Sequence, residues 1–320
     1  MDRSRRRPGL LILVAAGAVA AAPIGSPLHA LRWVAPGADG ARILTERPAE
    51  CLVRPRSPDD SYLVEVGRAA FRTPLVLGGG AARAQVECET CHRNGRTNPD
   101  FDLPGLSGAP GTADVTSFVF SPKRGDHVDD PRLIPDLGGP KAALKVSQAV
   151  GSPALERFIH GLVTEEFDGA EPPPAVLAGL AAYVRALSPS ACPSAATEPL
   201  TAADDVENSR RAVRAGLAAL ARGDAPTALT MVGAARSVLG DLAERYSAPG
   251  LKADVAGLRV ADLDLAAILA DIRRGDPGAR LGLETWMGRS GIWAKALIAD
   301  ERRSYYDRAA LAQAIGATAR

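Results

Sequence analysis

The sequence predicts an all-α protein in two parts. Aromatic residues make up only 4% of the 320 residues, whereas alanine is abundant and glycine and proline are frequent, which favours helices joined by ordered loops over a β-sandwich. Apolar residues recur at helical spacing in several segments. After residue 200 proline becomes sparse and Ala, Leu, Arg and Asp dominate, so we expect a second, separate α-helical domain of hairpins or a bundle over residues 201–320.

Residues 1–30 resemble an export signal. Four arginines precede an apolar stretch over residues 9–22, and small residues such as Ala18, Ala20 and Ala30 offer cleavage positions. The apolar stretch is shorter than the roughly 20 residues that a spanning helix needs. We therefore expect a cleaved signal peptide, a periplasmic or exported protein and no stable membrane insertion. An uncleaved N-terminal anchor is the alternative.

Residues 31–58 hold several prolines and little periodicity, so we expect an extended lead-in. Acidic residues at 59 and 60 are then followed by apolar residues at helical spacing, which predicts a helix ending at Thr73-Pro74. Glycines 78–80 break the pattern and lead to the most informative stretch of the chain.

That stretch is Cys88-Glu89-Thr90-Cys91-His92, a C-x-x-C-H pentapeptide and the attachment signature of c-type haem. Each thiol can add to one vinyl group of the porphyrin, and His92 then becomes the proximal iron ligand. A structural zinc site would need a second pair of ligands at short spacing, and none follows. A thioredoxin-like dithiol would lie in a βαβ setting, which the surrounding sequence lacks.

The segment over residues 93–140 is too rich in proline and glycine for a regular helix, and we expect it to wrap the haem edge. Two helices are predicted after it. The first starts near Ser152-Pro153 and carries an apolar stripe to Val163, and the second starts at the prolines 172–174 and ends before Pro189.

Four stretches together resemble the cytochrome c fold, namely GRAAFRTP, CETCHRNGRTNPDF, RLIPDL and LAAYVRAL. More narrowly they resemble one haem domain of the di-haem cytochrome c peroxidase and MauG-like family, over residues 59–190. The resemblance implies that Cys88 and Cys91 form the thioethers, that His92 is the proximal ligand and that Arg132 faces a haem propionate. An ordinary solvated loop arginine is the alternative for Arg132. The family uses two haems, whereas this chain has one C-x-x-C-H motif.

The second axial ligand decides between a carrier and a catalyst. No methionine lies between His92 and Cys192, so His/Met ligation within one domain is excluded. The remaining choices are His127, in the wrapping loop, and an open or water-bound position. His160 lies off the apolar stripe of its helix, and we expect it to be solvated. The two later methionines, Met231 and Met287, are expected to fill the core.

Two cysteines remain after haem attachment, Cys51 and Cys192, and in an oxidising compartment we expect them to form a disulfide. Two inert thiols are the alternative. A linker over residues 191–200 then leads to the second domain.

Helical stripes and two Arg-Gly-Asp joints, at residues 222–226 and 274–277, predict helical hairpins in this second domain. Its late aromatic residues suit either a docking patch or a bundle core: Trp286, Trp293, Tyr305 and Tyr306.

The leading functional hypothesis is therefore an exported mono-haem c-type cytochrome that passes single electrons to a redox protein partner. The alternative is a haem enzyme, peroxidase-like or MauG-like, with an open distal iron site; a haem-based sensor is a weaker third hypothesis. The net charge of +1, with interspersed acids and bases, does not indicate nucleic acid as a partner. The oligomeric state is not indicated.

Overall fold

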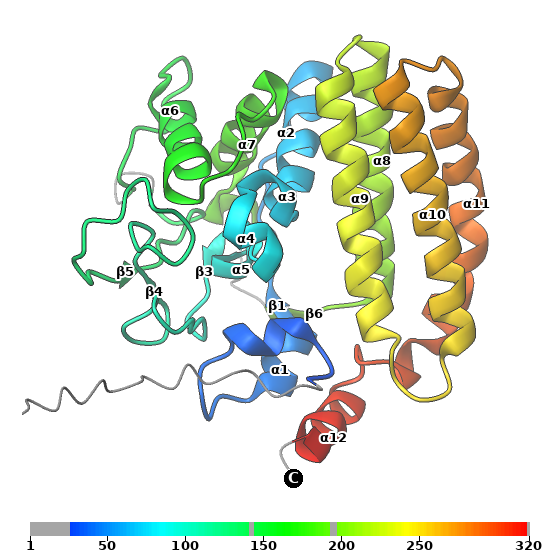
Figure 1. Cartoon of the computed structure of the whole chain (residues 1–320), viewed down its shortest axis with the longest axis horizontal. Helices are drawn as coiled ribbons and strands as arrows, with labels where there is room; N and C mark the ends of the chain where they lie inside the picture. Colours follow the sequence, from blue (N-terminus) through cyan, green and yellow to red (C-terminus); the bar gives the residue numbers. More distant parts are fainter. Residues whose placement is uncertain (1–25, 141–143, 193–196, 319–320) are drawn as a thin grey trace, which may run out of the picture.

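The structure, a computed structural model, describes residues 26–140, 144–192 and 197–318. Most of the expected signal peptide therefore lies outside the described residues. The chain is mostly helical with a few short strands, so the predicted all-α class is confirmed (Figure 1). In the part of the chain that the structure describes, no helix is both long and apolar enough to cross a membrane.

The segment over residues 31–58 is not the extended lead-in that we expected. It contains the end of a 3-10 helix, His29–Trp33, then α1 (Gly40–Thr45) and β1 (Glu46–Pro48). Asp39 caps α1 by accepting a hydrogen bond from the Arg42 backbone N–H at 2.9 Å. Strand β1 pairs antiparallel with β6 (Thr197–Pro199), in the predicted linker, and this long-range pairing leaves no signal in either local sequence.

The first large helix, α2 (Pro58–Phe71), begins one residue before the predicted start, with Ser57 as N-cap and Pro58 in the first turn. Three short helices follow, α3 (Pro74–Leu77), α4 (Gly79–Ala84) and α5 (Cys88–Cys91). Two small hairpins come next: β2 (His92–Arg93) pairs with β3 (Arg96–Thr97), and β4 (Thr112–Ala113) pairs with β5 (Arg132–Leu133).

Two more helices complete this first part, α6 (Ala154–Gly161), which runs into a π-helical turn over Leu162–Glu166, and α7 (Pro174–Ala186). Helices α2 and α7 touch where Gly67 meets Gly179. A Cβ atom on Gly67 would lie 1.9 Å from the Gly179 carbonyl oxygen, so only glycine allows this approach.

The second part consists of α8 (Ala202–Ala221), α9 (Ala225–Arg245), α10 (Lys252–Arg274) and α11 (Gly278–Asp300), which lie side by side (Figure 1), and the short α12 (Arg308–Thr318). Both predicted joints are present. Gly223 has φ +72° and Asp224 caps α9 by accepting from the Thr227 N–H at 3.0 Å, while Gly275 ends α10 with φ +69°.

Each part has its own apolar core, yet the two parts pack directly against each other. Ala215 of α8 and Met231 of α9 belong to the core of the first part, and α2 lies beside both helices. The second part is therefore not detached from the first. Three of the late aromatic residues, Trp286, Tyr305 and Tyr306, are buried in its core, with Trp293 packed beside them, which agrees with the bundle-core interpretation.

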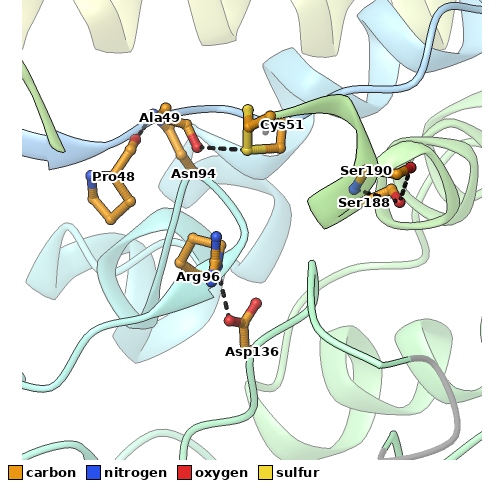
Figure 2. The surroundings of a disulfide bond; sticks show 9 residues. Pro48, Ala49, Cys51, Asn94, Arg96, Asp136, Ser188 and Ser190 are labelled. Atoms are coloured by element: carbon orange, nitrogen blue, oxygen red, sulfur yellow. Dashed lines mark hydrogen bonds and ion pairs between the residues drawn. A yellow bond between two sulfur atoms is a disulfide. The ribbon is translucent and has the colours of Figure 1, made fainter. Parts of the chain in front are cut away.

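Cys51 and Cys192 form a disulfide with a Cα–Cα distance of 5.3 Å (Figure 2). It joins the segment before α2 to the short 3-10 helix Pro189–Ala191 that follows α7. The Ser188 N–H also donates to the Cys51 carbonyl at 2.9 Å, so the beginning and the end of the first part are fastened together.

Candidate haem attachment site

The C-x-x-C residues form α5, a single helical turn closed by its own capping box. The Glu87 side chain accepts a hydrogen bond from the Thr90 N–H, and the Glu87 N–H donates to Thr90 Oγ1 at 3.1 Å. Cys88 and Cys91 remain free thiols, and both pack against the apolar core of the first part. Burial raises the pKa of each thiol to about 12, so both are protonated at neutral pH.

His92 follows directly and its ring is held by the backbone. Nδ1 lies 3.0 Å from the Pro135 carbonyl oxygen, which can only accept, so Nδ1 is the protonated nitrogen. The Phe71 ring lies beside it, 6.4 Å between centroids. Burial lowers the pKa of His92 to about 4, which keeps the imidazole neutral. The lone pair is thereby left on Nε2, the form in which histidine ligates metals.

The segment that carries Pro135 is fastened to the hairpin after the motif. Thr97 Oγ1 donates to the Ile134 carbonyl at 2.9 Å, and Arg96 Nε lies 2.8 Å from Asp136 Oδ2 (Figure 2). The position of the Pro135 carbonyl is therefore fixed on both sides.

A buried polar network holds α5 from the other side, with Arg72 at its centre. Arg72 Nη2 donates to Glu50 Oε1 (2.8 Å), to Asn94 Oδ1 (2.6 Å) and to the Tyr183 hydroxyl (3.1 Å). It also lies 3.4 Å from Glu89 Oε2, while Glu89 Oε1 accepts from the Asn94 N–H at 2.7 Å. The network thus links α2 and α7 to the middle of the C-x-x-C turn.

The charges in this network stabilise one another. Burial alone would raise the pKa of Glu50, but Arg72 and Arg68 outweigh it and hold that pKa well below its usual range. The Glu50 carboxylate is therefore ionised at every physiological pH, and it compensates the permanent positive charge of the Arg72 guanidinium.

Other residues singled out from the sequence lie elsewhere. Arg132 is 76% exposed and pairs with Asp130 at 2.6 Å, as a solvated loop arginine does. His127 is exposed and its ring contacts that of Phe118 in a tilted arrangement, with 4.5 Å between ring centroids. His160 lies 2.7 Å from Glu171.

The two later methionines contribute to the cores, as we expected: Met231 is fully buried, and Met287 packs against the core of the second part.

The residues that position the motif were not predicted from the sequence. The RLIPDL stretch was singled out for Arg132, whereas its structural contact with His92 is made by the backbone of Pro135. A carbonyl oxygen exists at every residue, so no residue type marks it. The Arg72 network was missed for another reason, because its members come from four distant segments.

No family model, curated protein or solved structure matches this chain. Any assignment of function therefore rests on the motif and its geometry. Within residues 26–140, 144–192 and 197–318, no group of three or more His, Cys, Asp or Glu side chains is arranged to hold a metal ion by itself.

Proposed function

We propose that the protein is an exported mono-haem c-type cytochrome that transfers single electrons through a haem attached to Cys88 and Cys91, with His92 as proximal ligand. The observation that carries the proposal is the contact between His92 Nδ1 and the Pro135 carbonyl at 3.0 Å. It sets the tautomer and the ring orientation that an axial histidine requires.

The donor set fits a covalently attached haem. Two thiols lie one helical turn apart on an apolar core, directly before a neutral imidazole whose Nε2 has no other hydrogen bond among the described residues. When bound, the haem supplies a one-electron couple whose potential is set by its axial ligands and by burial. The protein supplies the thioether anchors, the histidine orientation and the apolar surroundings.

The surface near Pro135 also suits a porphyrin. Leu133, two residues before Pro135, is 79% exposed, and Val128 in the same irregular segment is 58% exposed. Exposed apolar side chains on this segment are available to cover an apolar ring. The proposal keeps the prediction that residues 93–140 wrap the haem edge.

The test is expression with its own leader in a bacterium that has a c-type maturation system. We expect one haem per chain that stays with the polypeptide after denaturation and gives the pyridine haemochrome spectrum of thioether-linked haem. Cys88→Ser with Cys91→Ser loses the covalent haem, and His92→Ala changes the iron spectrum, whereas the exposed His160→Ala does neither. Wild-type protein that is folded, exported and free of covalent haem would overturn the proposal.

A second candidate is a peroxidase-like enzyme with an open distal iron site. It is favoured because two histidines that could have been the sixth ligand, His127 and His160, contact other side chains. The His127 ring contacts the Phe118 ring and His160 pairs with Glu171, so each has a partner other than iron. This candidate predicts peroxide turnover with an artificial electron donor. Protein with full haem occupancy and no turnover contradicts it and leaves the electron carrier.

A further inference from the structure

The carbonyl that accepts from His92 belongs to a short strap over residues 134–138. This strap is tied to the β2–β3 hairpin, which begins with His92 itself. The histidine and the carbonyl that orients it are therefore held by one small unit of structure. Three hydrogen bonds join the strap to the hairpin, one from Thr97 Oγ1 to the Ile134 carbonyl at 2.9 Å and two from the N–H groups of Leu137 and Gly138 to the Gly95 carbonyl at 2.8 and 3.3 Å.

The side chain of Asp136 fastens the same strap to the hairpin (Figure 2). Its Oδ2 lies 2.8 Å from Arg96 Nε, and its Oδ1 accepts from the Gly138 N–H at 2.9 Å. Both carboxylate oxygens are thus used to hold one backbone conformation. The Arg96 and Asp136 side chains are 28% and 32% exposed, and ion pairs that face solvent to this extent add little to stability. We therefore expect variants of this pair to fold.

The direction of the Pro135 carbonyl depends on this fastening. A peptide unit is planar, so the Pro135 carbonyl and the Asp136 N–H rotate together. The proline ring fixes φ at position 135, which leaves ψ of Pro135 and φ of Asp136 to set that rotation. Holding the Asp136 side chain on Arg96 restricts both angles and keeps the carbonyl directed at His92 Nδ1, 3.0 Å away.

A well-directed hydrogen bond at Nδ1 changes the histidine as an iron ligand. An imidazole that donates its other N–H to a fixed acceptor is a more basic ligand. A more basic axial ligand stabilises ferric over ferrous iron, and hydrogen bonding around the ligands is one of the means by which a protein sets the potential of a haem. A loosened strap should therefore raise the reduction potential.

We propose that Arg96 and Asp136 are positioning residues for the haem ligand, whose ion pair holds the Pro135 carbonyl on His92 Nδ1 and thereby lowers the reduction potential of the haem. The inference rests on the proposed function, because the potential belongs to the attached haem. The hydrogen bond itself is a property of the polypeptide, so it is measured separately.

The first test is potentiometric titration of the haem-loaded protein. Arg96→Gln and Asp136→Asn each remove the ion pair, so we expect each to have a higher reduction potential than the wild type. The double variant should shift no further than one of the single variants, because the two residues act through one contact. Arg280→Gln is the matched control and should leave the potential unchanged, since Arg280 Nε lies 2.9 Å from Glu284 Oε1 in an exposed pair on α11.

The signs of the two shifts separate positioning from charge. Burial lowers the pKa of His92 and the Asp136 carboxylate opposes this effect, so the charge of Asp136 reaches the ring. If charge alone mattered, Asp136→Asn would raise the potential and Arg96→Gln would lower it, because the two substitutions remove opposite charges. Shifts of opposite sign, or shifts that add in the double variant, overturn the proposal.

The second test is nitrogen-15 NMR of the haem-free, reduced full chain, with His92→Ala to assign the signal. We expect a slowly exchanging His92 Nδ1–H in the wild type and in Arg280→Gln. In Arg96→Gln and Asp136→Asn the exchange should be about tenfold faster, because a hydrogen bond that opens more often exchanges more often. Unchanged exchange in both variants overturns the positioning role. Wild-type protein that never acquires haem overturns the proposed function instead, and the NMR result then still decides the positioning role.

Discussion

Glu50 and Arg72 form a buried ion pair, with 2.8 Å between Glu50 Oε1 and Arg72 Nη2 and side chains that are 13% and 9% exposed. The pair joins the segment next to the disulfide to the end of α2, and through Glu89 it reaches the C-x-x-C turn, α5. Breaking a buried pair leaves one charge without compensation, which costs much more than the pair contributes when intact.

We therefore predict that Glu50→Gln lowers the free energy of unfolding by about 3–5 kcal/mol. Urea denaturation followed by circular dichroism measures it. Glu65→Gln is the control on α2, because Glu65 pairs with Arg211 at 3.0 Å with both side chains about one-third exposed, and it should cost about 1 kcal/mol or less. If the two variants lose similar free energies of unfolding, the buried Glu50–Arg72 pair contributes no more to stability than the partly exposed Glu65–Arg211 pair.

Asp241 makes stability depend on pH in the opposite direction to an ordinary buried salt bridge. Its pKa rises from 3.8 to about 7 on folding, so between these values the folded state binds more protons than the unfolded state. The free energy of unfolding attributable to Asp241 therefore falls as pH rises from about 4 to about 7. We predict that Asp241→Asn gains stability relative to the wild type across this window and that the gain is constant above it. Denaturation curves of both proteins across the window test this, and a difference that does not vary with pH contradicts it.

The features predicted from sequence were those that local residues determine. Helices α2, α7, α8 and α9 follow from apolar spacing and from caps that lie within the same segment, such as Ser57 and Asp224. The disulfide was predicted by elimination, because only Cys51 and Cys192 remained once Cys88 and Cys91 had been assigned to haem attachment. The structure contains this disulfide.

The features that were missed depend on partners far along the chain. Strand β1 forms by pairing with β6, where Arg47 lies opposite Glu198. The turn at His92 is held by the carbonyl of Pro135, 43 residues later in the chain. Each of these residues is ordinary in its own neighbourhood, and only the folded chain brings them together.

Removal of the disulfide should destabilise the protein. Cys51 and Cys192 are 141 residues apart, and a bond that closes so long a loop restricts the unfolded chain strongly. We predict that Cys51→Ser with Cys192→Ser lowers the free energy of unfolding by about 2–5 kcal/mol. The wild type treated with a mild reductant should match the variant; if reduction has no effect on stability, the two cysteines are not bonded in solution.

The N-terminus of the mature protein should lie before Leu28. Leu28 is 3% exposed in the core of the second part, and Glu244 accepts from the backbone N–H of His29 at 3.1 Å. Cleavage after Ala30 would remove both contacts, whereas cleavage near Ala18 or Ala20 would keep them. Mass spectrometry of the exported protein should therefore show a first residue at or before position 27, and a mature chain that begins at Leu31 would contradict the prediction.

The last prediction concerns the sixth ligand of the proposed haem. The ring of His127 contacts the ring of Phe118 on an exposed loop, so we expect it not to ligate iron. His127→Ala should then leave the absorption spectrum of the reduced protein unchanged, and carbon monoxide should shift the bands of wild type and variant alike, because an open position binds it. Arg132→Ala, on the same loop, is the control for general disturbance. If carbon monoxide shifts the bands only in the variant, His127 is the ligand, and the second candidate, the enzyme with an open distal iron site, is ruled out.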